Sequence, residues 1–338
     1  MLKPFSMKKT VLLFFSSIMC LAIFGQKKPP SIDLHKTETA ILDEGRKLYQ
    51  LQMATTLGLD AFLQLPKDVV NSASGYFAFR EGKFYKCVFY NNLYNADIIS
   101  TILFDSAFNK VRTAISNTLR PMTNNERDLY FMRIRTLDEI KKDTALFKLY
   151  TTTTTVVLPI IDNNDRRVYV LTKSDDPSTV LFGNDYVLDF DKANYVSAKK
   201  AIHNDLISID CVRPGALEDE ELSNVTHKHQ GETGDFMTAT DVCTILMNQK
   251  KAGWGHQVVK SENYVSVWYC DSDELETMTI KKWNKYNKED KKDSKSADGD
   301  TDAKGKKKES LTAATPQSNG EQKLWTYDQG IITVSNTH

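Results

Sequence analysis

The stretch that guides the interpretation of this chain is Thr226-His227-Lys228-His229, followed after a loop by Thr238-Ala239-Thr240-Asp241 at the start of an apolar run. Two of the six histidines stand here, one residue apart. Alternate residues of an extended strand point to the same face, so both imidazoles can reach one ion. Neutral imidazoles and carboxylates are common zinc ligands. The stretch therefore predicts a zinc site formed by His227, His229 and Asp241.

The length and composition are those of a globular protein. The chain has 338 residues, of which 41% are apolar, so it can bury a substantial core in one large or two ordinary domains. The formal net charge is zero. Without residues 1–26, which carry Lys3, Lys8 and Lys9 and no acid, 41 basic residues face 44 acidic ones. This balance gives no electrostatic argument for a nucleic-acid partner, and we expect none.

Residues 1–26 have the layout of a signal peptide. A basic start at Met7-Lys8-Lys9 precedes an apolar run over residues 11–24, and Gly25-Gln26 follow. About 14 apolar-dominated residues are too few to span a bilayer comfortably, so we expect no stable membrane span. The sequence thus predicts an exported chain, periplasmic or extracellular. Cys20 raises a lipoprotein as the alternative, although Met19 stands where a small residue is expected.

Four further cysteines remain after the signal peptide, in a compartment that permits disulfides: Cys87, Cys211, Cys243 and Cys270. No Cys-x-x-Cys pair occurs, and four cysteines in so long a chain cannot form a disulfide scaffold. Their state stays open between buried free thiols and a single bridge.

Residues 27–150 are predicted to form an N-terminal α+β region. Helical periodicity covers residues 37–65 and stops at Pro66. Strand-like patterns over residues 75–105 predict a hairpin plus one more strand. A cap-like start at Thr123-Asn124-Asn125-Glu126 then predicts a long charged helix that extends to about residue 150.

Residues 151–284 are predicted to form a second domain. Its β-branched and alternating segments predict strands at residues 151–161, 167–173, 180–191, 195–203, 257–259 and 264–269. Those within 167–203 would form an antiparallel meander, and a helix is expected over residues 239–248. The next segment, 285–322, is predicted to be disordered because 16 of the 25 residues from Lys285 to Glu309 are charged. Residues 323–338 regain strand character.

Around the two histidines the sequence resembles the JAMM family of metallopeptidases, also called MPN⁺ or JAB, whose motif is His-x-His, a spacer and Ser-x-x-Asp opening a helix. His227-Lys228-His229 matches the first half and Thr238–Asp241 the second, with Thr in the place of Ser. The resemblance covers about residues 160–270. It implies a JAMM-like (cytidine-deaminase-like) α/β domain that holds zinc through His227, His229 and Asp241. It also implies a peptidase or isopeptidase that acts on a peptide or protein substrate, with Thr238 orienting a water.

Three features depart from the family pattern. Gln230 stands where the family commonly has Pro, and the eleven-residue spacer from His229 to Asp241 is one residue longer than usual. The family's catalytic Glu has no counterpart, since no Glu occurs between Glu139 and Glu218. Its replacements would be upstream aspartates or glutamates of an acidic loop, namely Asp175, Asp176, Asp185, Asp189, Glu218, Glu220 and Glu221.

Each of these residues also has a purely structural interpretation. Thr238-x-x-Asp241 is a capping box in its own right, and His227 and His229 can be solvated residues at a strand end. His256 is more simply a packed or surface histidine than a fourth ligand. Two functions stay open, a metal-dependent hydrolase and a non-catalytic secreted binding or structural protein that retains the fold. The sequence indicates neither a specific substrate nor an oligomeric state.

Overall fold

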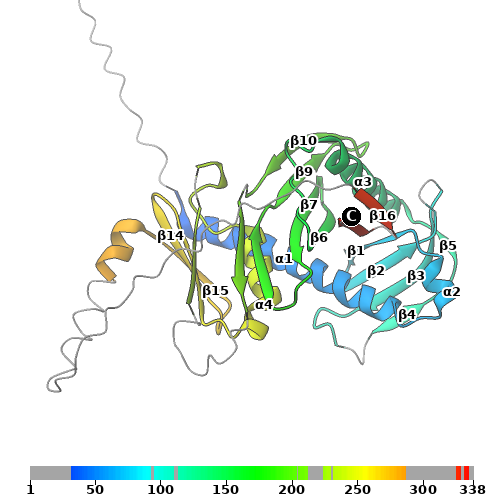
Figure 1. The fold of residues 1–338 in the computed structure, drawn as a ribbon, viewed down its shortest axis with the longest axis horizontal. Coiled ribbons are helices and arrows are strands. Elements are labelled where there is room, and N and C mark those ends of the chain that lie inside the picture. Colours follow the sequence, from blue (N-terminus) through cyan, green and yellow to red (C-terminus); the bar gives the residue numbers. More distant parts are fainter. Residues whose placement is uncertain are drawn as a thin grey trace, which may run out of the picture. The chain divides into compact units, whose positions relative to one another are not determined.

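The computed structural model describes residues 32–92, 95–109, 113–203, 205–211, 224–229 and 231–286, and the backbone of two short strands, 325–328 and 331–334 (Figure 1). Contacts divide the chain into two units, Met1–Asp33 and Leu34–His338. The expected signal peptide, the acidic loop of Glu218, Glu220 and Glu221, and most of the charged segment 285–322 lie outside the described residues. The second unit confirms the α+β class, with helices and antiparallel or mixed sheets.

The first sheet is antiparallel, in the order β1-β2-β3-β4, with β5 also paired to β3. Its strands are β1 (Gly75–Glu81), β2 (Phe84–Tyr90), β3 (Asp97–Phe104), β4 (Ala114–Ser116) and β5 (Arg120–Pro121). The predicted hairpin is β1–β2, and Gly82 in its turn has a φ of 61° that favours glycine. The short helix α2 (Lys67–Asn71) follows Pro66, where the helical pattern was expected to stop.

Helix α3 (Asn124–Lys142) begins where the sequence predicts but ends earlier than residue 150. Thr123 caps it, with Glu126 completing a reciprocal capping box. Asp143 leaves the helical conformation with a ψ of 69°, and its carboxylate accepts a hydrogen bond from the Leu146 N–H at 3.1 Å. This local turn competes with another helical turn and stops the helix.

The second sheet has the order β10-β9-β7-β6, and all of its pairs are antiparallel. Its strands are β6 (Thr153–Asp162), β7 (Asp165–Ser174), β9 (Tyr186–Phe190) and β10 (Val196–Ala201). The strand expected over residues 180–191 is two strands, because Gly183 and Asn184 have φ angles of 90° and 53°. The first part, β8 (Thr179–Gly183), pairs instead with β11 (Leu206–Asp210), so the predicted meander holds only for β7, β9 and β10.

The third sheet carries the two histidines of the opening motif. Its order is β12-β13-β14-β15, comprising β12 (Asn224–Lys228), β13 (His256–Lys260), β14 (Tyr264–Tyr269) and β15 (Glu274–Thr279), the last of which was not predicted. Strands β12 and β13 are parallel and need a crossover, which is supplied by a 3-10 turn η3 (Gly231–Thr233) and helix α4 (Ala239–Ala252). Gly253 ends α4 with a φ of 65°, a left-handed cap.

Helix α1 (Leu34–Phe62) is the element against which these layers pack (Figure 1). It contacts α4, β1, β2, β3, β6 and β15. Leu48 and Ala54 are fully buried on it, and burying a leucine contributes about 1.5–3 kcal/mol. A Cβ at Gly45 would lie 2.6 Å from the Val242 Cβ, so this glycine allows α1 and α4 to approach closely. The neighbour of Val242 is Asp241, whose place in the core therefore depends on this packing.

Two short strands lie in the C-terminal segment that was predicted to regain strand character. Strands β16 (Trp325–Asp328) and β17 (Ile331–Val334) form an antiparallel hairpin, and β17 contacts β6. Among the helices that the structure describes, none has the length and apolar character needed to cross a bilayer. Cys87 and Cys243 are buried, Cys211 and Cys270 are half-buried, and all four are free thiols.

Candidate metal centre

His227 and His229 are positioned by strand β12 as strand geometry requires. His227 is 4% exposed, Lys228 is exposed and His229 is 5% exposed, so the two imidazoles lie on the side that faces α4. The His229 N–H donates to the Lys260 carbonyl at 2.9 Å, which continues the pairing with β13 one residue beyond β12. The backbone of His229 is thus held as firmly as that of a strand residue.

Asp241 is placed by the capping box of α4. The Thr238 N–H and hydroxyl both donate to Asp241 Oδ2, at 2.8 and 2.9 Å, and the Asp241 N–H donates to Thr238 Oγ1 at 3.1 Å. Thr238 Oγ1 also lies 3.0 Å from Thr240 Oγ1. Asp241 is 1% exposed, so its carboxylate is aimed into the protein rather than at solvent. The expected capping box is present, and it directs a carboxylate towards the histidines.

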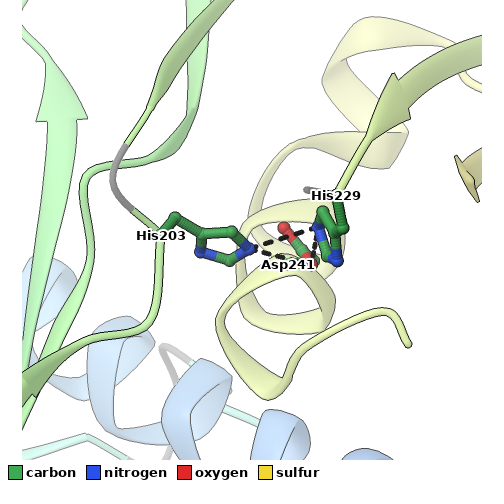
Figure 2. A group of neighbouring side chains, drawn as sticks. All are labelled: His203, His229 and Asp241. Atoms are coloured by element: carbon green, nitrogen blue, oxygen red, sulfur yellow. Dashed lines mark hydrogen bonds and ion pairs between the residues drawn. The ribbon is translucent and has the colours of Figure 1, made fainter. Parts of the chain in front are cut away.

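A third histidine, His203, completes this group from the connection between β10 and β11 (Figure 2). Its Nε2 lies 3.2 Å from His229 Nε2 and 3.5 Å from Asp241 Oδ2, while His229 Nε2 lies 3.3 Å from the same oxygen. His203, His229 and Asp241 are all buried, and their ligand atoms lie within 4.8 Å of one another. Such a group could hold a metal ion.

His227 lies against the same group on its other side. Its Nε2 is 3.2 Å from His229 Nε2 and 3.6 Å from Asp241 Oδ1, the carboxylate oxygen that makes no hydrogen bond. Its Nδ1 has no hydrogen-bond partner, and the ring packs on Phe182 with centroids 5.2 Å apart. Of the three predicted ligands, His229 and Asp241 belong to the group of mutually close ligand atoms together with His203, while His227 contacts His229 and Asp241 from outside it.

The hydrogen bond of His229 restricts where protons can sit. His229 Nδ1 lies 2.9 Å from the Phe236 carbonyl, which can only accept, so Nδ1 carries a proton. In the neutral ring, Nε2 then presents a lone pair, and two other Nε2 atoms lie 3.2 Å from it. Lone pairs at this separation repel unless a proton or a cation lies between them. The three Nε2 atoms are thus arranged to accept a proton or a cation between them.

The charges within the group are strongly coupled. Burial alone would lower the pKa of His203, but Asp241 and Asp185 outweigh burial and raise it to about 10. Burial alone would raise the pKa of Asp241, but His203 and His229 hold it well below its usual range. Burial lowers the pKa of His227 and favours its neutral form. Without a metal, a proton on His203 faces the Asp241 carboxylate, and a metal would displace that proton.

Asp185 stands behind His203, at the start of β9. Its Oδ2 is 3.5 Å from His203 Nδ1, an ion-pair contact that lacks hydrogen-bond geometry. Burial raises the pKa of Asp185, and His203 opposes that effect. Of the aspartates considered as replacements for the family's Glu, Asp175 accepts from Thr154, Asp176 from Ser178, and Asp189 pairs with Arg167. Among the described residues in that set, Asp185 is the one that contacts the cluster.

The remaining histidine considered as a ligand lies elsewhere. His256, at the start of β13, is exposed, and its ring packs edge-on against Tyr269 with centroids 5.1 Å apart. Its position fits the packed or surface interpretation.

Two buried residues of the site, His203 and Asp185, were not predicted as a pair. Asn184-Asp185 interrupts the apolar run from Val180 to Leu188, and a polar pair inside such a run signals either a strand break or a buried polar site. His203 ends the next strand pattern, before Asn204-Asp205. These signals were present but gave no reason to join the two residues to the motif at 226–241.

Comparison of the chain with protein-family models, with curated proteins and with solved structures finds no match. We therefore infer the function from the geometry of the site itself.

Proposed function

We propose that this protein binds one divalent metal ion, zinc in the first place, through His203, His229 and Asp241. We further propose that His227, whose Nε2 lies 3.2 Å from His229 Nε2 but outside that group, turns towards the ion as the fourth donor. The supporting observation is the convergence of ligand atoms. A tetrahedral zinc with bonds of 2.0–2.1 Å has ligand atoms about 3.4 Å apart. The separations among the Nε2 atoms of His203 and His229 and Asp241 Oδ2 are 3.2, 3.3 and 3.5 Å.

The donor types favour zinc over harder cations. Calcium and magnesium prefer shells of oxygen ligands, whereas imidazole nitrogen suits zinc and neighbouring transition metals. Three of the four donors here are imidazoles. One of them, His229, already has its ring orientation fixed by the Phe236 carbonyl, which is the usual outer-shell partner of a metal-bound histidine.

We propose that the role of this metal is structural. With His227 drawn in, four protein donors would close a tetrahedral shell, whereas a catalytic zinc keeps one position for water or substrate. The side chains of His203, His227, His229 and Asp241 are between 1% and 7% exposed. The ion would join the β10–β11 connection, which follows the second sheet, to strand β12 of the third sheet and to helix α4. The protein is then a metal-stabilised, non-catalytic module, whose expected export is supported by the pattern of residues 1–26.

A second candidate is a metal-dependent hydrolase of peptidase or isopeptidase type. It is supported by the order of β12, α4 and the parallel strand β13, with His-x-His at one end and Thr-x-x-Asp at the other, as the JAMM resemblance implies. His229 also borders a hollow of about 720 Å³ with Lys228 and Lys260. A bound metal would supply a water of lowered pKa. For this function, His203 would have to leave one coordination position of the metal free for water or substrate.

Metal analysis of the purified protein tests the proposal. We expect about one zinc ion per chain after purification without chelators, and zinc K-edge absorption spectra with four nitrogen or oxygen neighbours. A protein that neither retains nor takes up zinc contradicts the metal site. Peptide and isopeptide substrates distinguish the two roles: cleavage that is lost on chelation and in Asp241→Asn would favour the hydrolase.

A further inference from the structure

The connection between β8 and β9, residues 183–185, has an unusual backbone that is fixed from several sides. Gly183 and Asn184 both have positive φ, and a Cβ at Gly183 would lie 2.1 Å from the Asp205 carbonyl oxygen. The Asn184 side chain donates to the Lys148 carbonyl at 2.9 Å and to Thr172 Oγ1 at 2.8 Å. Positive φ at a residue other than glycine persists where the surroundings enforce it.

This connection is hydrogen-bonded to the segment that carries His203. The Asn184 N–H donates to the Asp205 carbonyl at 2.8 Å. In return, the N–H groups of Ile202 and His203 donate to the Asp185 carbonyl, at 2.7 and 3.3 Å. Two loops from separate strand pairs are thus joined backbone to backbone. The main chain of His203 is held by the same residue whose side chain faces its ring.

We propose that Asp185 is the positioning residue that makes His203 a metal ligand. This inference rests on the proposed metal site. It assigns to Asp185 the role of orienting one of the ligands, His203. A carboxylate at Nδ1 keeps the proton on that nitrogen and leaves the Nε2 lone pair for the metal. The Asp185 Oδ2 to His203 Nδ1 separation of 3.5 Å places the carboxylate on that side of the ring.

The surroundings of Asp185 support a fixed carboxylate. Asp185 is 4% exposed, and its Oδ1 accepts a hydrogen bond from the Thr172 N–H at 3.3 Å. The Thr240 hydroxyl, next to the ligand Asp241, also interacts with the carboxylate. Asp185 therefore touches both sides of the metal site, the His203 segment and the first turn of α4. A contraction of the 3.5 Å contact to hydrogen-bond length is expected when zinc fixes the ring.

The same geometry argues against Asp185 as a replacement for the catalytic Glu. A proton shuttle has to reach the metal-bound water, on the Nε2 side of the histidines. Asp185 contacts the opposite nitrogen of His203, so the imidazole ring lies between its carboxylate and the Nε2 group. The carboxylate is placed to orient a ligand, not to transfer a proton at the ion.

Zinc affinity, measured by competition with a chromophoric chelator on the full mature chain, tests this role. We expect Asp185→Ala to weaken zinc binding by about 10- to 100-fold. Asp185→Asn, which keeps an acceptor oxygen, should lose less. The matched control is Asp189→Asn, four residues along β9, where the side chain is 50% exposed and pairs with Arg167; its affinity should equal that of the wild type.

NMR of the imidazole nitrogens in Asp185→Asn shows which nitrogen of His203 carries the proton, a property that general destabilisation would not change. This measurement also tests the role of Asp185 if Asp185→Ala fails to fold. We expect His203 to lose its preference for a proton on Nδ1 in the zinc-bound state. A wild-type chain that binds zinc while both variants bind it equally tightly, with His203 unchanged, overturns this inference alone. A wild-type chain that binds no zinc overturns the proposed function and this inference with it.

Discussion

The two long helices that follow a threonine cap, α3 and α4, use the same local device for different ends. Thr123 and Glu126 cap α3, and Thr238 and Asp241 cap α4, each through reciprocal side-chain and backbone hydrogen bonds. Both acids are 1% exposed. Up to this point the two helix starts are equivalent, and sequence alone would describe them in the same words.

The difference lies in what faces the buried carboxylate. Arg120 forms a two-fold pair with Glu126, at 2.7 Å to each oxygen, and this permanent cation satisfies the acid. Asp241 instead faces the Nε2 atoms of His203, His227 and His229, at 3.5, 3.6 and 3.3 Å. Imidazoles are neutral or charged according to their surroundings, so this carboxylate can share them with a metal. The partners of the buried carboxylate therefore decide whether a capping box could also hold a metal ion.

The largest expected difference between the two boxes is in metal content. Asp241→Asn should lower zinc from about one ion per chain to near zero, because the anionic ligand is lost. Glu126→Gln should keep its zinc and lose about 1–3 kcal/mol of stability, since the charged hydrogen bonds to Arg120 weaken. Elemental analysis and denaturant unfolding measure both. Retention of zinc in Asp241→Asn would mean that the ion sits elsewhere.

Removal of the metal by a chelator should also distinguish the capping box of α4 from that of α3. An ion present at 100 times its Kd adds about 2.7 kcal/mol to folding. For a chain of this size, that corresponds to a fall of about 4–5 °C in Tm on chelation. Calorimetry should show this fall in the wild type and in Glu126→Gln, and no fall in Asp241→Asn. An unchanged wild-type Tm would argue against a stabilising ion.

The stability of the metal-free protein should depend on pH in opposite directions at the two capping boxes. The pKa of His203 is raised from 6.5 to about 10, so its contribution to stability is complete below about 6.5 and is lost as the pH rises through about 10. Burial would raise the pKa of Glu126, but the hydrogen bonds from Arg120 outweigh burial and lower it. The Glu126 carboxylate therefore contributes its full stability above pH 4.5, and this contribution is lost as the pH falls.

Denaturant unfolding in a chelating buffer between pH 3 and pH 10 measures the curve of unfolding free energy against pH, with its acidic and its alkaline limb. His203→Gln should flatten the alkaline limb, and Glu126→Gln should reduce the slope of the acidic one. A wild-type alkaline limb that His203→Gln leaves unchanged would show that His203 is not charged in the metal-free protein.

The smallest expected effect concerns the caps themselves. Thr123→Ala and Thr238→Ala should each cost about 1 kcal/mol in unfolding free energy. Only Thr238→Ala should also weaken zinc binding, because the Thr238 hydroxyl donates to Asp241 Oδ2. Thr238→Ser keeps the hydroxyl and should behave as the wild type in both measurements. Equal zinc affinity in all three variants would reduce Thr238 to a cap alone.

The sequence predicted the parts of this site that depend on short-range geometry. Strand alternation placed His227 and His229 on one face, and the capping pattern placed Asp241 at a helix start, because both rules involve neighbours along the chain. It also predicted most helices and strands. The wrong element bounds lie where local turns intervene, at Asp143, which ends α3 early, and at Gly183-Asn184, which splits one expected strand between two sheets. Strand β15 was not predicted.

By itself the sequence determined that His227, His229 and Asp241 could meet, since the helix start that carries Asp241 follows the strand of the two histidines after one connection. Only the tertiary structure decided that His203 joins them, 26 residues before His229, and that Asp185 stands behind it. Their approach depends on how the β8–β9 and β10–β11 connections hydrogen-bond to each other and pack beside α4. Contacts of this kind arise from the packing of separate sheets, which no local pattern of residues encodes.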